Sequence, residues 1–150
     1  MKKKLFIGLV LLLVIIQFIQ PGKNIATTPS KNAIANKYTV PEDVSTILKT
    51  SCYDCHSNNT VYPWYSNIQP GAWFMAHHID EGKRELNFDE FLSYPNRKAA
   101  HKLEEVAEVV EKHEMPLSSY TLIHTNAKLN DQQIKILKDW ALGLKAEIEK

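Results

Sequence analysis

The chain is poor in cysteine: Cys52 and Cys55 are the only two among its 150 residues. Because there is no second cysteine pair, a zinc site built from four thiolates is excluded. A disulfide across only two intervening residues would be strained, so a structural bridge between these two is disfavoured. The two cysteines are therefore better explained by a functional site than by a structural disulfide.

The chain also lacks a convincing run of alternating apolar and polar residues, which is the pattern of a half-buried β-strand. Basic residues are scarce after residue 38. All 17 acidic residues but only 12 of the 18 basic ones fall within 39–150, so this part carries a net charge of −5 while the whole chain carries +1. Nucleic acid and anionic lipid headgroups need clustered Lys and Arg, so nucleic acid is excluded as a partner of this part of the chain.

The two cysteines belong to the sequence Cys52-Tyr53-Asp54-Cys55-His56. This is the C-x-x-C-H pattern by which haem c is attached to a protein. Two thiols three positions apart on one helical turn can each add to a vinyl group of the porphyrin, and the histidine next in line supplies the proximal iron ligand. The motif predicts one covalent haem, bound by Cys52 and Cys55, with His56 on the iron.

Two other interpretations of the cysteines remain as alternatives. A thioredoxin-like redox pair needs a strand that leads into a helix, and a Cys/His metal site needs further ligands at suitable spacing. The residues before Cys52 predict a helix instead, with Val44, Ile47 and Leu48 at helical spacing.

The first nineteen residues have the pattern of an export signal, in which Lys2–Lys4 precede an apolar run from Leu5 to Ile19. Haem is attached to c-type proteins outside the cytoplasm, so this pattern and the motif support each other. No small-x-small cleavage site follows, which favours an uncleaved single-pass anchor in the cytoplasmic membrane with the haem domain on the periplasmic side. As a helix the run would be about 22 Å long, short of a hydrocarbon core of roughly 30 Å. A soluble periplasmic protein after cleavage is the alternative.

The rest of the chain divides into two parts. Residues 20–38 are rich in Pro, Asn, Thr, Ser and Lys without apolar periodicity, which predicts a flexible linker between the 1–19 segment and a domain over 39–150. Helices are predicted after a capping box at Thr39 and Glu42, over Pro70–Gly82, after Asn96, and after a second box at Asn130 and Gln133. We therefore predict a small all-α domain of four or five helices around the haem, behind an N-terminal hydrophobic helix.

The iron has a sixth coordination position, for which Met115 is the predicted ligand. It precedes Pro116 just past a helix, a context that presents a thioether from a loop. An open site remains possible, and other side chains are alternatives. These are Met75, His77, His78, His101, His113 and His124.

Several segments carry a resemblance to known proteins. The order of the motif, Met115-Pro116 and a last helix with Leu137-Lys138-Asp139-Trp140-Ala141 resembles class I cytochrome c. More narrowly, the chain from about Tyr38 to Trp140 resembles the bacterial haem-binding domain family, exported and cytochrome c-like. The segments that carry it are Cys52–Asn58, Tyr62–Ile68, Leu86–Phe88 and Glu114–Pro116. The resemblance implies haem c and the machinery that attaches it, and does not define a physiological partner.

Three aromatic residues between Asn58 and Tyr94 are candidate contacts to the haem propionates. Trp64, Tyr65 and Trp73 each offer a polar tip on an apolar ring, although such residues are commonly plain core. The second ring nitrogen of His56 needs an acceptor, and a backbone carbonyl near Pro63 or Pro70 is the candidate.

The leading functional hypothesis is a membrane-tethered monohaem cytochrome, not an enzyme, that passes single electrons to and from redox partner proteins outside the cytoplasm. A peroxidase-like enzyme is an alternative, with His113 or Glu114 as a distal acid or base. A sensor of a gas or of redox state is another, although the chain has no recognisable output module.

Overall fold

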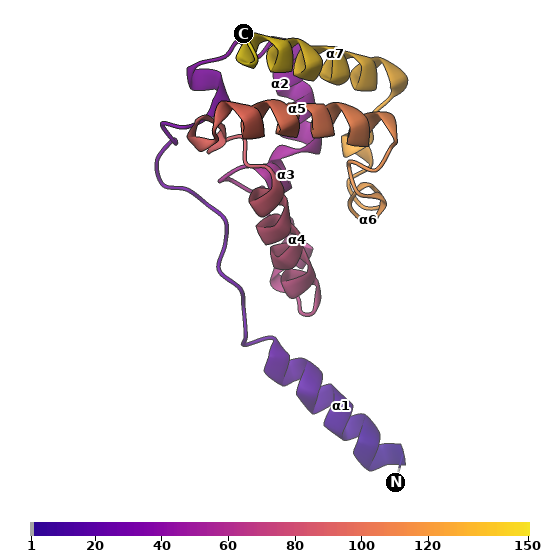
Figure 1. Cartoon of the computed structure of the whole chain (residues 1–150). Helices are drawn as coiled ribbons and strands as arrows, with labels where there is room; N and C mark the ends of the chain where they lie inside the picture. Colours follow the sequence, from indigo (N-terminus) through magenta and orange to yellow (C-terminus); the bar gives the residue numbers. More distant parts are fainter. Residues whose placement is uncertain (1) are drawn as a thin grey trace.

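The computed structural model describes residues 2–150, and over that range it contains helices and no strand (Figure 1). The elements are α1 (Lys2–Ile16), η1 (Ile34–Asn36), α2 (Glu42–Ser51), α3 (Tyr53–His56), η2 (Trp64–Asn67), α4 (Gly71–Glu85), η3 (Phe91–Ser93), α5 (Asn96–Glu111), α6 (Ser118–Thr121), η4 (Thr125–Ala127) and α7 (Asp131–Ile148), where η marks a 3₁₀-helix. The all-α prediction is confirmed. The count is larger than expected because α3 and α6 are single turns.

The hydrophobic core lies where α2 packs against the pair α5 and α7, which run side by side (Figure 1). Each helix places its apolar residues on one face by the three-four spacing of a helix. Leu48, Leu103 and Leu137 are fully buried, one from each helix. On the outer side, Glu104 pairs with Lys145 across α5 and α7. The predicted apolar faces are therefore the faces that meet.

Of the three side-chain caps predicted at helix starts, one is formed. The capping box of Asn130 and Gln133 is formed at the start of α7. At α2 the chain instead enters the helix through Pro41, and no side chain caps it. The predicted cap at Asn96 is also wrong, because Pro95 precedes the helix and Asn96 is its first residue.

Residues 20–38 lie against the domain, which differs from the flexible linker predicted there. Ile34 is 1 % exposed, belongs to the core, and its N–H donates to the Phe88 carbonyl. Further toward the N-terminus, the Asn24 amide donates to Ser57 O and Thr60 Oγ1, both at 2.9 Å. The polar residues of this stretch therefore hydrogen-bond to the domain as well as to one another.

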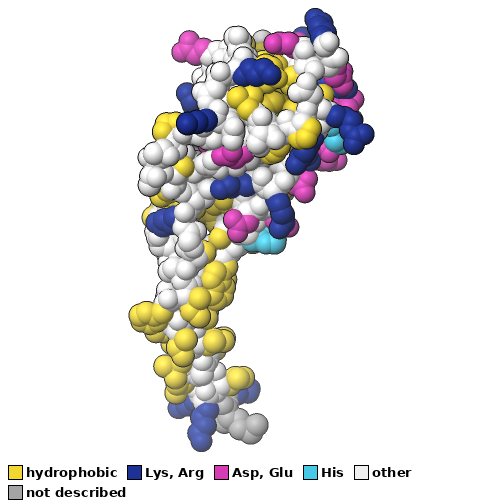
Figure 2. Space-filling model, turned by 60° about the vertical axis from the view of Figure 1, so that its left-hand side comes forward, with side chains coloured by type: hydrophobic (Ala, Val, Ile, Leu, Met, Phe, Trp, Pro, Cys, Tyr) yellow, Lys and Arg dark blue, Asp and Glu magenta, His cyan; other side chains and the backbone are white. Residues whose placement is uncertain are grey.

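The N-terminal helix α1 projects away from the domain, and its apolar side chains are exposed (Figures 1 and 2). It ends at Ile16, and its neighbour Gln17 accepts a hydrogen bond from the backbone of Gln69 at 2.9 Å. Within residues 2–150, no helix combines the length and the hydrophobicity needed to cross a membrane. The single-pass span predicted for residues 1–19 is therefore not supported.

Candidate functional site

The C-x-x-C-H motif lies where α2 passes into α3. The backbone N–H groups of Cys55 and His56 both donate to the Cys52 carbonyl, at 3.1 and 2.9 Å, so the motif forms one helical turn. Both thiols are free. Burial, with the neighbouring Cys55, raises the pKa of Cys52 to about 12, and burial with nearby Asp54 raises the pKa of Cys55 to about 11. Because a reactive cysteine is a thiolate, these protonated thiols do not favour the redox-pair alternative.

His56 is held by one of its two ring nitrogens. Its Nδ1 lies 2.9 Å from the Leu86 carbonyl, an acceptor that requires the ring proton on Nδ1. Burial lowers the pKa of His56, so the ring is neutral and Nε2 keeps its lone pair. The predicted acceptor near Pro63 or Pro70 is wrong, because the chain after α4 returns to α3, where Phe88 N donates to His56 O at 2.8 Å.

A glycine lets α4 approach the motif closely. A Cβ atom at Gly82 would lie 2.6 Å from the Cys55 carbonyl oxygen, which is closer than atoms can pack. No other residue type fits there without displacing the motif. Sequence reasoning missed this position, although a glycine inside a helical pattern is a known sign of close approach.

Three adjoining cavities, which we call the cleft, open beside the motif. Their volumes are about 180, 320 and 300 Å³, and we name them outer, middle and inner. Cys52, His56 and Met115 line both the middle and the inner cavities, and Cys55 lines the outer and the middle ones. The structure therefore brings the two cysteines predicted to attach the haem and the two side chains predicted to bind its iron to one cleft.

Met115 reaches this space because the chain turns sharply after α5. The N–H groups of Glu114 and Met115 both donate to the Val109 carbonyl, and His113 takes a positive φ of 56°. A residue in the left-handed region is a common way to end a helix, and it reverses the chain direction within a few residues. The turn carries Met115 back to the cleft.

The comparisons with known proteins agree with this geometry. A family model described as a haem-binding domain matches residues 11–142. The chain belongs to the haem-binding domain family. This confirms the resemblance and establishes haem binding, and no curated protein or solved structure matches the chain.

The cleft suits the haem that the family binds. The inner cavity is walled by apolar side chains of α5 and α7, among them Val106, Val110 and Leu137. Cys52 and His56 line the inner cavity together with these apolar walls, and Cys55 joins them at the middle cavity. A flat apolar ring system with one metal ion needs such a combination.

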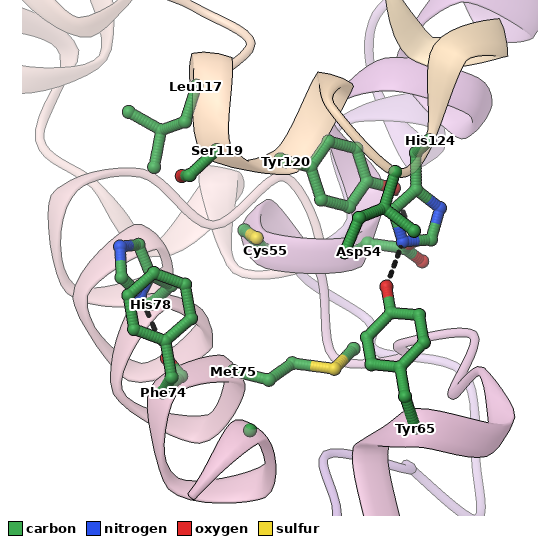
Figure 3. A pocket seen from close by; sticks show the side chains of 12 residues that line it. Asp54, Cys55, Tyr65, Phe74, Met75, His78, Leu117, Ser119, Tyr120 and His124 are labelled. Atoms are coloured by element: carbon green, nitrogen blue, oxygen red, sulfur yellow. Dashed lines mark hydrogen bonds between the residues drawn. The ribbon is translucent and has the colours of Figure 1, made fainter.

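The other candidate iron ligands divide into two groups. His77 and His101 are solvent-exposed and pair with Glu81 and Glu105, and His113 is also exposed. In contrast, Met75, His78 and His124 line the outer cavity, and Figure 3 shows the Met75 side chain extending from α4 toward Tyr65. Met75, an alternative iron ligand in the sequence, is therefore a cavity residue.

Of the three aromatic candidates for propionate contacts, only Tyr65 lines the cleft. Trp64 is 77 % exposed and Trp73 38 % exposed, and neither lines any of the three cavities of the cleft. Tyr65 does line the outer cavity, where its hydroxyl is hydrogen-bonded to His124 Nε2 (Figure 3). The structure thus gives no support to propionate contacts from the two tryptophans.

A polar group beside the motif was not foreseen from the sequence. The Tyr120 hydroxyl donates to Asp54 Oδ2 at 2.7 Å, and the Tyr120 ring stacks on His124 at 4.2 Å (Figure 3). Burial and the Asp54 carboxylate raise the pKa of Tyr120, which therefore keeps its donor proton. Because Asp54 and Tyr120 are 66 residues apart, no local pattern could reveal the pair.

Proposed function

We propose that this haem-binding protein is a monohaem c-type cytochrome that transfers single electrons outside the cytoplasm. The carrying observation is that Cys52, Cys55, His56 and Met115 converge on one cleft while His56 Nδ1 is already bonded to Leu86. When bound, the haem would supply an iron that exchanges one electron at a time.

Each residue has a defined part in this proposal. Cys52 and Cys55 would hold the macrocycle through thioethers, and His56 would bind the iron through Nε2. The Leu86 carbonyl fixes the His56 tautomer and the ring plane. Met115 would also bind the iron and so exclude external ligands.

An electron carrier is favoured over a catalyst by what surrounds Met115. A peroxidase-like enzyme needs an acid or base over an open iron. His113 and Glu114, the candidates for that part, are exposed and line none of the three cavities. The position of Met115 at the cleft, with both of these candidates outside it, supports electron transfer, with redox partner proteins as donor and acceptor.

The location is the second part of the proposal. Lys2–Lys4 with the apolar α1 would direct export, and α1 would keep the protein associated with the membrane. Fractionation of cells that produce the full chain tests this, with N-terminal sequencing of the exported protein. Recovery of the haem-loaded protein in the cytoplasm alone would contradict it.

The functional test is a set of absorption spectra of the full chain, produced with a haem-maturation system. We expect haem that resists extraction by acid and acetone, a low-spin spectrum with the far-red methionine-to-iron band in the ferric state, and no immediate spectral shift when carbon monoxide is added, because binding must wait for Met115 to leave the iron. Cys52→Ala with Cys55→Ala should leave no covalent haem, as read by mass spectrometry.

The ligand is assigned by a matched pair of variants. Met115→Ala should lose the far-red band and bind carbon monoxide, whereas Met75→Ala should keep the band. Loss of the band in Met75→Ala alone would move the iron ligand to α4. A wild-type protein that is high-spin and binds carbon monoxide readily would favour an enzyme or a sensor.

A further inference from the structure

Two side-chain hydrogen bonds join the middle of the segment that carries Met115 to the rest of the protein. We call residues 115–127 the distal segment. Its start is fixed by hydrogen bonds to Val109 O, and its end by Ala127, which is fully buried. Between these ends, and among residues 2–150, the hydrogen bonds that leave the segment are Tyr120 to Asp54 and His124 to Tyr65.

Apolar packing supplies little to hold the middle of this segment. Leu122 is 80 % exposed and Ile123 is 62 % exposed, so their side chains contribute little burial. The one turn of helix there, α6, has four residues, too few to be stable alone. The position of the middle of the distal segment depends on its side-chain hydrogen bonds.

The two hydrogen bonds act as one unit. The rings of Tyr120 and His124 are stacked at 4.2 Å and 9°, so displacing one ring disturbs the other (Figure 3). Asp54 is itself fixed, because its Oδ1 accepts from Val61 N at 2.9 Å and its carbonyl accepts from Thr60 Oγ1 at 2.6 Å. Asp54 lies between the two cysteines, so the unit joins the distal segment to the motif itself.

We propose that Asp54, Tyr120, His124 and Tyr65 form a latch that keeps the distal segment, and with it the Met115 thioether, closed over the haem cleft. These are positioning residues: they act through Met115 and decide whether the sixth iron position is open to external ligands. The inference rests on the proposed function, because it assumes that Met115 binds the iron. It adds that Asp54, a residue of the motif, controls how readily small ligands reach the iron.

The test measures the rate at which carbon monoxide binds to the ferrous, haem-loaded full chain. Tyr120→Phe removes the hydroxyl and keeps the stacked ring. Loss of a hydrogen bond to a carboxylate should raise the carbon monoxide binding rate about tenfold, since binding must wait for Met115 to leave. Tyr65→Phe, which breaks the outer bond, should give a smaller increase.

Tyr62→Phe is the matched control. The Tyr62 hydroxyl accepts a hydrogen bond from Asn24 N at 2.7 Å, away from the distal segment. This variant also loses one hydrogen bond, and we expect it to lower the denaturant midpoint while carbon monoxide binds at the wild-type rate. A general loss of stability would move both proteins in the same way, whereas a latch separates them.

The outcomes separate the latch from the function beneath it. Wild-type protein with the far-red band, together with faster carbon monoxide binding in Tyr120→Phe, supports the latch. The same band with unchanged rates in Tyr120→Phe and Tyr65→Phe overturns the latch and leaves the cytochrome proposal standing. Wild-type protein without the band overturns both. If Tyr120→Phe does not fold, the rate in Tyr65→Phe decides.

Discussion

The two halves of the domain bury their apolar side chains in different ways. In the core half, made of α2, α5 and α7, the largest side chains such as Leu48 and Leu137 are fully buried against one another. In the cleft half, made of η2, α4 and α6, Phe74 is 57 % exposed and both Trp64 and Leu122 are close to 80 % exposed. The core half is complete with its own side chains, whereas the cleft half surrounds space that the protein does not fill.

This difference places the haem between a rigid wall and an adjustable one. The inner cavity is walled by α5 and α7, whose packing is set by the core. The outer cavity is walled by α4 and the distal segment, which are held mainly by Gly82 packing and the latch. Substitutions in the core half should therefore change overall stability, and those in the cleft half should change the haem environment first.

The largest effect should come from Leu103→Ala in the core half. Leu103 is fully buried in the core cluster, and the cavity left by such a truncation typically costs about 3 kcal/mol. Denaturant unfolding of the haem-loaded protein measures this, and the far-red band should persist until the whole domain unfolds. Leu142→Ala is the control, because Leu142 is 38 % exposed on α7 and its loss should cost little. Equal costs at the two positions would contradict the core assignment.

A smaller effect, but one centred on the haem, should follow from Gly82→Ala. The new methyl group would meet the Cys55 carbonyl at 2.6 Å, and such overpacking costs roughly 1–3 kcal/mol. The yield of covalent haem should also fall, because Cys55 must move. Gly143→Ala on α7 has open space around it and should instead stabilise the protein by about 0.5–1 kcal/mol. If both variants load haem like the wild type, Gly82 does not set the position of the motif.

The core half is the part that the sequence predicts well. Leu103, Val106 and Val110 recur at helical spacing, and burial of that face in α5 follows directly. The box of Asn130 and Gln133 is local, so its four-residue pattern suffices. The motif is likewise local, and its cysteines and histidine share a helical turn as expected.

The cleft half could not be predicted to the same extent, for physical reasons. The latch joins Asp54 to Tyr120 across 66 residues, and the acceptor for His56 lies 30 residues away at Leu86. Neither distance is expressed in any local periodicity. The contacts of residues 20–38 were not foreseen for the same reason, since Ile34 lies in the core and Asn24 hydrogen-bonds to Ser57 and Thr60 in a stretch whose composition is that of a linker.

The smallest effect should come from substitution of Glu90, which hydrogen-bonds residues 30–32 to the domain beside the motif. Its carboxylate accepts hydrogen bonds from Ser30 Oγ at 2.9 Å, Asn32 Nδ2 at 3.0 Å and Asn58 Nδ2 at 2.9 Å. The bonds from Asn32 and Asn58 contribute most to lowering the pKa of Glu90 below its usual value near 4.5. A carboxyl with a lowered pKa stabilises the fold above its usual pKa, and this contribution is lost as the pH falls through the lowered value.

Glu90→Gln should therefore lower the free energy of unfolding at pH 7 by less than about 1 kcal/mol, because the group is partly solvated. The difference from wild type should shrink as the pH falls below the usual carboxyl value of about 4.5 and through the lowered pKa of Glu90, where the wild-type carboxyl takes up its proton. Trypsin should also cut faster after Lys31 in the variant at pH 7. Glu147→Gln, an exposed position near the end of α7, should change neither quantity. Asn58 lies two residues after the motif, and Asn32 lies two residues before the buried Ile34. Equal trypsin rates would therefore mean that the Glu90 hydrogen bonds do not help to hold this stretch to the domain.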